Sequence, residues 1–185
     1  MVREVMVQVR WLIPLGTAAA ATAQVAYATQ YLSVEQAQHA AFAGASEFRS
    51  LPAIDAALAT SLGAAAGWSP RIFEARANAQ TLGWVIVDQV IGKSELITYA
   101  LALDAAGAVI SVEVLEYRES HGGEIRMPAW RKQFVGKTPS DVGALGGEIK
   151  NISGATLSCR HLTEGVQRLL KLYDATLKST RRGVG

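Results

Sequence analysis

Hydrophobic and polar side chains alternate between residues 71 and 117, which is the period of β-strands. This pattern predicts four consecutive strands at residues 71–77, 82–91, 95–104 and 109–117. In the third strand Ile97, Tyr99, Leu101 and Leu103 share one face. The connections at Ile91–Ser94 and Asp104–Gly107 are too short for crossover helices, so we expect antiparallel neighbours.

A helical pattern precedes the predicted strands. Ser33-Val-Glu-Gln36 has the form of a capping box and predicts a helix from Val34 to about Phe42. Ser50-Leu-Pro-Ala predicts the start of a second, alanine-rich helix, which is expected to end near Gly63 or Gly67. Residues 29–70 therefore form a predicted N-terminal helical segment.

The pattern after the strands is again helical. We expect a helix around Ala129–Val135, a glycine-rich link at Gly143–Gly147 and a short strand-like segment at Ile149–Ile152. A long C-terminal helix is predicted because apolar residues recur there at helical spacing, at Leu162, Val166, Leu169, Leu170, Tyr173 and Leu177. The predicted fold class is α+β, a predominantly antiparallel sheet flanked by helices.

The first 28 residues have the pattern of an export signal. Arg3 and Arg10 precede an apolar run, and Ala26-Tyr27-Ala28 fits the small-x-small rule for cleavage before Thr29. The alternatives are an N-terminal anchor and a buried or amphipathic helix. We expect residues 1–28 to be a signal peptide or anchor that directs the chain out of the cytoplasm.

Composition excludes several classes of function. The 185 residues carry 18 Lys+Arg against 16 Asp+Glu without a basic cluster, so we expect no nucleic-acid partner. One cysteine, Cys159, and three scattered histidines do not suggest a metal site. A hydrolase using Cys159 or Ser158 would lack a nearby base, and we nominate no catalytic residue.

One candidate site opens the predicted C-terminal helix at Ser153-Gly-Ala-Thr-Leu-Ser158. A helix N-terminus presents unpaired N–H groups and the positive end of the helix dipole, which suit a phosphate. Gly154 allows close approach of the backbone, Ala155 adds no bulk, and Thr156 and Ser158 offer hydroxyl groups. The alternative reading is that Ser153 is a simple N-cap and Gly154 a flexible joint.

A second candidate site follows the fourth predicted strand. Its polar residues form a lip that could surround a planar ligand: Glu119, Ser120, His121, Gly122 and Gly123. The same residues also suit an ordinary solvated loop. Trp130 and Phe134 lie four residues apart on the next predicted helix, where core packing is the usual reading and ring stacking the other.

Together these motifs resemble the FMN-binding domain family, whose members include flavin-carrying subunits of the Rnf complex and of sodium-translocating NADH:quinone reductase. The family's Ser/Thr-Gly-Ala-Ser/Thr-x-Ser/Thr motif reads Ser153-Gly-Ala-Thr-Leu-Ser158 here, and Glu119-Ser-His-Gly122 is similar to its Glu-Thr-Pro-Gly loop. Gln133-Phe-Val-Gly-Lys137 is similar to the ending of its following helix. The resemblance extends from Ile72 to Leu170, and we expect the FMN-binding domain to occupy residues 71–185.

The resemblance implies an exported electron-transfer flavoprotein with one FMN joined to Thr156 by a phosphodiester. It implies a flavin transferase for maturation, redox partner proteins, some of them membrane-bound, and a periplasmic location or an anchor at the outer face of the bacterial inner membrane. The phosphate would lie against the start of the last helix, and the isoalloxazine near the Glu119–Gly123 loop and Trp130. We expect an electron-transfer component more than a stand-alone enzyme.

Two positions depart from the family pattern. Lys150 stands where the family usually has Asp, three residues before the motif, and His121 replaces the proline of the loop. These departures leave two alternatives open: noncovalent FMN, or an exported interaction or small-ligand-binding module of the same fold without redox activity.

Overall fold

The computed structural model describes residues 29–180. Six antiparallel strands form one sheet in the order β1-β6-β5-β4-β3-β2. Their bounds are β1 Thr29–Gln30, β2 Glu47–Ser50, β3 Arg71–Ala77, β4 Gln80–Ile91, β5 Leu96–Asp104 and β6 Val109–Tyr117. The predicted α+β class and the four central antiparallel strands are confirmed. The predicted export signal lies outside the described residues.

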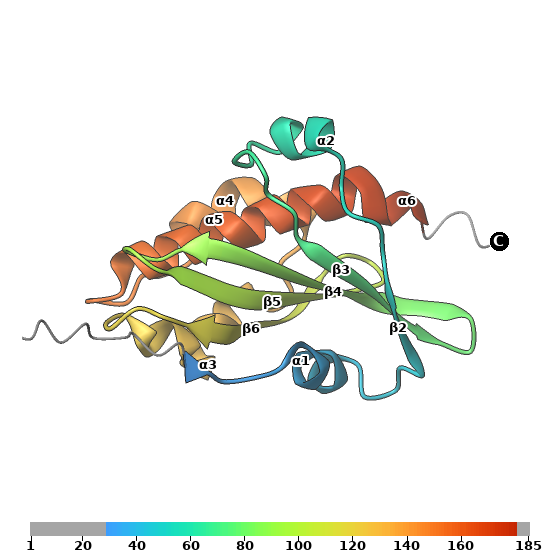
Figure 1. Ribbon diagram of the computed structural model, residues 1–185, viewed down its shortest axis with the longest axis horizontal. Coiled ribbons are helices and arrows are strands. Elements are labelled where there is room, and N and C mark those ends of the chain that lie inside the picture. The colour runs from blue at the N-terminus through green and yellow to red at the C-terminus, as the bar shows by residue number, and fades with distance from the viewer. Residues whose placement is uncertain (1–28, 181–185) are drawn as a thin grey trace, which may run out of the picture.

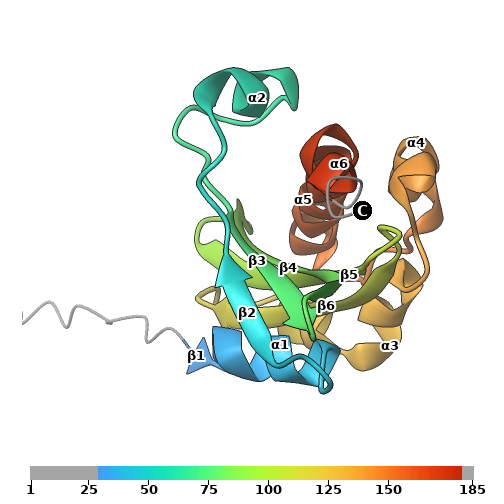
Figure 2. The same cartoon turned by 90° about the vertical axis from the view of Figure 1, so that its right-hand side faces the viewer.

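The helices cover the two faces of the sheet (Figure 1). On one face lie α2 Ala56–Ser61, α4 Val142–Glu148, α5 Thr156–Leu172 and α6 Lys178–Thr180; Figure 2 shows that α2 stands away from the sheet. The π-helical turn Tyr173–Leu177 joins α5 to α6. On the other face lies α1 Val34–Ala41. None of the helices within residues 29–180 is long and apolar enough to span a bilayer.

Alternation along the strands divides the core into two layers. Trp84, Ile86 and Tyr99 belong to the larger cluster, which includes the apolar stripe of α5. Val85, Val87, Ala100 and Ala102 belong to the smaller cluster, together with Ala37 and Phe42 at α1. All six stripe residues predicted for the C-terminal helix are buried, so their role in core packing is confirmed.

The N-terminal helical segment contains more than the predicted helices. The capping box is confirmed, because Ser33 Oγ accepts from the Gln36 N–H at 3.2 Å and Gln36 accepts from the Ser33 N–H at 2.7 Å. The second helix begins at Ala56, where Asp55 caps it, and the prediction of a start at Ser50 was wrong. Ser50 lies in β2, whose pairing with β3 the local sequence did not reveal.

Two predictions after the sheet were also wrong. Gly143–Gly147 lies within helix α4, because burial of Leu145 in the core offsets the poor helix propensity of glycine. Ile149–Ile152 forms no strand. The helix expected at Ala129–Val135 is split into α3 Pro128–Arg131 and the 3-10 turn Lys132–Phe134. The other 3-10 turns are Gly123–Arg126 and Pro139–Asp141.

Candidate functional site

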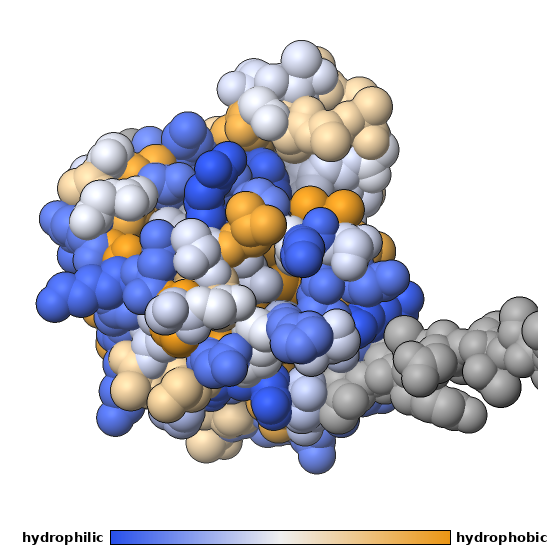
Figure 3. Space-filling view, turned by 90° about the vertical axis from the view of Figure 1, so that its left-hand side faces the viewer, coloured by the Kyte–Doolittle hydropathy of each residue, from blue (hydrophilic) through white to orange (hydrophobic). Residues whose placement is uncertain are grey.

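Three segments meet at one end of the molecule: the β4–β5 turn, the loop after β6 and the start of α5 (Figure 1). They enclose a cavity of about 410 Å³, which is within the range of small-ligand sites. The cavity is lined by Lys93, Ser94, Glu119, Ser120, His121, Gly154, Ala155, Thr156, Leu157 and Ser158. Figure 3 looks at this end of the molecule, where hydrophobic residues lie scattered among hydrophilic ones.

The start of α5 lies on the cavity without a side-chain cap. Helix α5 begins at Thr156, and in the described structure its N-cap residue Ala155 makes no side-chain hydrogen bond to it. Gly154 has φ +88°, a conformation that favours glycine, and this turns the chain into the helix. The first-turn N–H groups and the exposed Thr156 hydroxyl therefore belong to the cavity wall. Ser153 is exposed and is not among the residues that line the cavity. It does not cap α5 either, so the alternative reading of Ser153 as a simple N-cap was wrong.

The loop after β6 is fixed over this helix start by Tyr117. The buried Tyr117 hydroxyl donates to the His121 carbonyl oxygen at 2.5 Å and lies 3.4 Å from Ser158 Oγ. Burial is the main cause that raises the pKa of Tyr117. Gly122 has φ +84°, and a Cβ there would lie 2.8 Å from the Tyr117 hydroxyl. Gly122 of the loop and Ser158 of α5 thus both lie against the Tyr117 hydroxyl, and Gly122 does not line the cavity.

Glu119, Ser120 and His121 of the same loop line the cavity. His121 Nδ1 lies 2.9 Å from Ser120 Oγ, and both residues are exposed. This pairing orients the imidazole ring that stands where the family pattern has proline. Gly123 lies outside this cavity and lines a separate shallow hollow with Glu124, Arg126 and Met127.

Glu119 faces the β4–β5 turn. Its Oε1 accepts from the backbone N–H groups of Lys93, Ser94 and Glu95, the last two at 2.6 and 2.9 Å. Partial burial alone would raise the pKa of Glu119, but these backbone donors outweigh burial and hold the pKa below its usual range. The carboxylate is therefore ionised and engaged with the turn.

Trp130 is not part of the cavity. It is buried in the core with its ring 5.3 Å from that of Phe134 in an edge-to-face contact, so the core-packing alternative is confirmed. Its indole N–H donates to the Lys150 carbonyl oxygen at 2.7 Å, and Gln133 accepts from the Lys150 N–H at 2.9 Å. Trp130 and Gln133 hold the backbone just before the motif, and the Lys150 side chain is left exposed.

Sequence reasoning missed Lys93 and Ser94 as cavity residues. They lie 24 or more residues before the Glu119 loop and were assigned only to a connecting turn. A usable signal did exist, because in three consecutive antiparallel strands the β4–β5 turn and the end of β6 lie at the same end of the sheet. Among the described residues that line the cavity, Lys93 is the only lysine or arginine.

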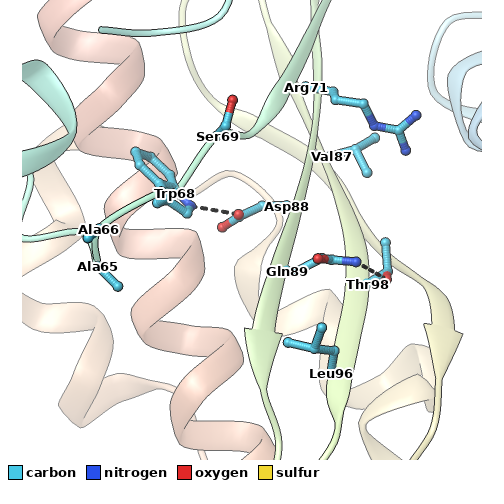
Figure 4. A pocket seen from close by; sticks show the side chains of 11 residues that line it. Ala65, Ala66, Trp68, Ser69, Arg71, Val87, Asp88, Gln89, Leu96 and Thr98 are labelled. Carbon is cyan, nitrogen blue, oxygen red and sulfur yellow. Dashed lines mark hydrogen bonds between the residues drawn. The ribbon is translucent and has the colours of Figure 1, made fainter. Parts of the chain in front are cut away.

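A larger cavity of about 550 Å³ lies beside β4 (Figure 4) and shares no lining residue with the first one. In its wall the Trp68 indole donates to Asp88 at 2.7 Å, and the Tyr99 hydroxyl donates to the same carboxylate at 2.9 Å. Burial raises the pKa of Asp88 despite these bonds and the Arg168 guanidinium 3.8 Å away. Asp88 is thus engaged by Trp68, Tyr99 and Arg168, which is the pattern of a structural network.

The described residues contain no cluster of His, Cys, Asp or Glu suited to a metal ion. Cys159 is buried and unbonded to another cysteine, and burial raises the pKa of its thiol.

Comparison with known proteins agrees with this geometry. Residues 92–171 match the FMN-binding domain family. Over 111 residues the chain is 30% identical to a subunit of the ion-translocating oxidoreductase complex of Stutzerimonas stutzeri, an alignment that covers 54% of this chain and 49% of the relative. The chain thus spans about half the length of that relative. The resemblance inferred from the sequence is confirmed: the FMN-binding domain family matches residues 92–171 of the chain.

Proposed function

We propose that this chain is an exported flavoprotein that carries electrons through one FMN held in the cavity at the start of α5. The observation that carries the proposal is the position of Thr156. Its exposed hydroxyl lies on the first turn of an uncapped helix and on the wall of a cavity large enough for a small ligand. We propose a phosphodiester between this hydroxyl and the flavin phosphate.

The residues present fit an anionic flavin. The α5 N–H groups and Lys93 supply positive potential for the phosphate, and Ser94, Ser120 and His121 supply hydrogen-bonding groups around the opening. When bound, the isoalloxazine ring would supply the redox chemistry. The chain's own residues bind and orient the group, and nothing in the described site suggests a separate substrate pocket. We therefore propose an electron-transfer component and not a stand-alone enzyme.

Partners and location follow from the same proposal. The relative from Stutzerimonas stutzeri belongs to an ion-translocating oxidoreductase complex, which supports redox partner proteins for this chain, including membrane-bound ones. Maturation by a flavin transferase is part of the proposal. So is a place in the periplasm or at the outer face of the bacterial inner membrane, supported by the signal-like pattern of residues 1–28. We propose that residues 71–185 form the flavin domain, preceded by the segment 29–70.

Visible absorption tests the function. The full chain is produced with a flavin transferase, purified from the exported fraction and scanned before and after reduction with dithionite. The proposal predicts flavin bands in the blue region that bleach on reduction and return in air. A colourless protein that gains no flavin from added FMN would contradict it and leave the binding-module alternative. Colour that is lost on denaturation and desalting would indicate noncovalent FMN, the alternative that Lys150 favours.

A further inference from the structure

The β4–β5 turn, residues 92–95, is held from two sides by side chains that lie far away in the sequence. On its N–H side, Glu119 Oε1 accepts from Lys93, Ser94 and Glu95, and Ser94 Oγ donates to Glu119 Oε2 at 3.2 Å. Three convergent N–H groups form an anion-binding concavity, and a carboxylate of the same chain fills it. The turn conformation therefore depends on Glu119.

On the carbonyl side, His161 of α5 completes the arrangement. Its Nδ1 lies 2.7 Å from the Ile91 carbonyl oxygen and 2.9 Å from that of Gly92. Carbonyl oxygens only accept, so Nδ1 carries the proton and donates. The turn is thus tied both to the loop after β6 and to α5, the two other segments that line the cavity.

Gly92 makes the close contact with Glu119 possible. A Cβ at this position would lie 2.6 Å from Glu119 Oε1 and 3.0 Å from its Cγ. Four hydrogen bonds fix the carboxylate, so it cannot move away from such a Cβ without breaking them. Gly92 therefore leaves the space that Glu119 occupies, and the exposed Lys93 of the same turn lines the cavity together with the start of α5.

Lys93 and the α5 N-terminus present positive potential from two walls of one cavity. Glu119 would oppose this potential if its charge faced the cavity unpaired, but the three N–H groups of the turn engage it. Resting on the proposed function, we propose that Lys93 binds the phosphate of FMN, and that Glu119 and His161 are positioning residues that hold the turn for it. In this account Glu119 acts through the turn and not by contact with the flavin.

Paired titrations with FMN and riboflavin test the proposal, because riboflavin lacks the phosphate. Binding to the full chain, produced without a flavin transferase, is followed by quenching of flavin fluorescence. The wild type is expected to prefer FMN. Lys93→Met keeps the aliphatic stem and removes the charge, and it should weaken FMN binding about tenfold or more while leaving riboflavin binding unchanged. Lys132→Met, at an exposed lysine that does not line the cavity, is the control and should change neither affinity.

If Glu119 acts by positioning Lys93, the effects of substitutions at the two residues on FMN binding should be coupled. Glu119→Ala should weaken FMN binding as Lys93→Met does, and the double variant should lose little more than either single variant. Glu119→Gln keeps an acceptor oxygen and should recover most of the affinity. Hydrogen exchange at the amides of Lys93, Ser94 and Glu95 should accelerate in Glu119→Ala and slow again in Glu119→Gln, independently of any flavin.

The results that would overturn this proposal differ from the result that would overturn the proposed function. Equal losses for FMN and riboflavin in Glu119→Ala, or fully additive losses in the double variant, would reduce Glu119 to a general structural role and overturn the proposal. FMN binding that is unchanged in Lys93→Met, or a wild type that binds no free FMN, would also overturn it. The proposed function fails separately, if the chain neither binds FMN nor acquires it covalently. Should Glu119→Ala fail to fold, the FMN and riboflavin affinities of Lys93→Met and Glu119→Gln still test the proposal.

Discussion

The side-chain oxygens of Tyr117 and Ser158 lie 3.4 Å apart, although the two residues are separated by 41 positions in the chain. Tyr117 ends β6 and Ser158 lies in the first turn of α5. Because the same hydroxyl donates to the His121 carbonyl oxygen at 2.5 Å, this contact places the loop after β6 over the helix start. The two motifs recognised in the sequence meet through this tyrosine.

Replacement Tyr117→Phe should loosen that loop. The variant leaves the His121 carbonyl oxygen without its buried donor, and we expect the free energy of unfolding to fall by about 1 kcal/mol. FMN affinity should fall as well, because Ser120 and His121 lose their fixed position at the cavity. Urea unfolding and FMN titration measure the two effects.

Tyr31→Phe is the matched control, since Tyr31 is 37% exposed and directly follows β1 in the chain. It should change stability by less than about 0.5 kcal/mol. Equal behaviour of the two tyrosine variants would contradict the role assigned to the Tyr117 hydroxyl.

Gly165 sets how closely α5 approaches the sheet. A Cβ at this position would lie 2.5 Å from the Tyr99 hydroxyl and 2.8 Å from Val90 Cγ1. Gly165→Ala should therefore lower the free energy of unfolding by about 1–2 kcal/mol, even though alanine favours helix by about 1 kcal/mol. Thermal unfolding followed by circular dichroism measures the change.

Gly146→Ala in α4 supplies the comparison. Its Cβ would meet nothing closer than Gln167 Nε2 at 3.7 Å, an ordinary contact. Only the helix preference then remains, and stability should rise by up to about 1 kcal/mol. A stabilising effect at both glycines would mean that α5 can move away from β4 at no cost.

Glu74 makes the stability depend on pH. Burial alone would raise its pKa, but the hydrogen bond from Thr81 and the guanidinium groups of Arg49 and Arg76 outweigh burial, so the folded-state pKa lies below the unfolded one. Such a carboxylate contributes stability above the unfolded pKa, and the contribution is lost as the pH falls through the folded pKa. Glu74→Gln should cost on the order of 2 kcal/mol at neutral pH.

Urea unfolding of the wild type and of Glu74→Gln over a pH series measures the contribution of the Glu74 charge to stability. The difference between wild type and Glu74→Gln should be largest near neutrality and shrink in acid, below the ordinary pKa of glutamate. A difference that stays constant down to the lowest pH would show that the Glu74 charge does not supply the stabilisation.

Much of the fold could be predicted because the spacing of apolar side chains differs between strands and helices. Apolar and polar residues alternate over many positions between Arg71 and Tyr117, and the apolar stripe of α5 repeats over several helical turns. Strands β1 and β2 are only two and four residues long, too short to show a period, and they form through pairing with β6 and β3. Helix α4 was missed because burial of Leu145 overrides local glycine content.

The site residues could be predicted only where several of them are neighbours in the sequence. The segments around Thr156 and Glu119 were found in this way, and the structure brings both to one cavity. Lys93 was missed because its place depends on the β4–β5 pairing and on Glu119 from a distant loop. Trp130 was expected near the isoalloxazine ring on the strength of the family resemblance, but it lies in the core and donates to the Lys150 carbonyl oxygen instead.

The intact mass of the chain after production with a flavin transferase shows whether Thr156 carries the flavin. With a phosphodiester at Thr156, wild type and Thr156→Ser should gain the mass of FMN less one water, and so should Thr60→Ala, at an exposed threonine of α2. Thr156→Ala should gain nothing. A flavin adduct that persists in Thr156→Ala, or an unmodified wild type, would contradict the phosphodiester at Thr156.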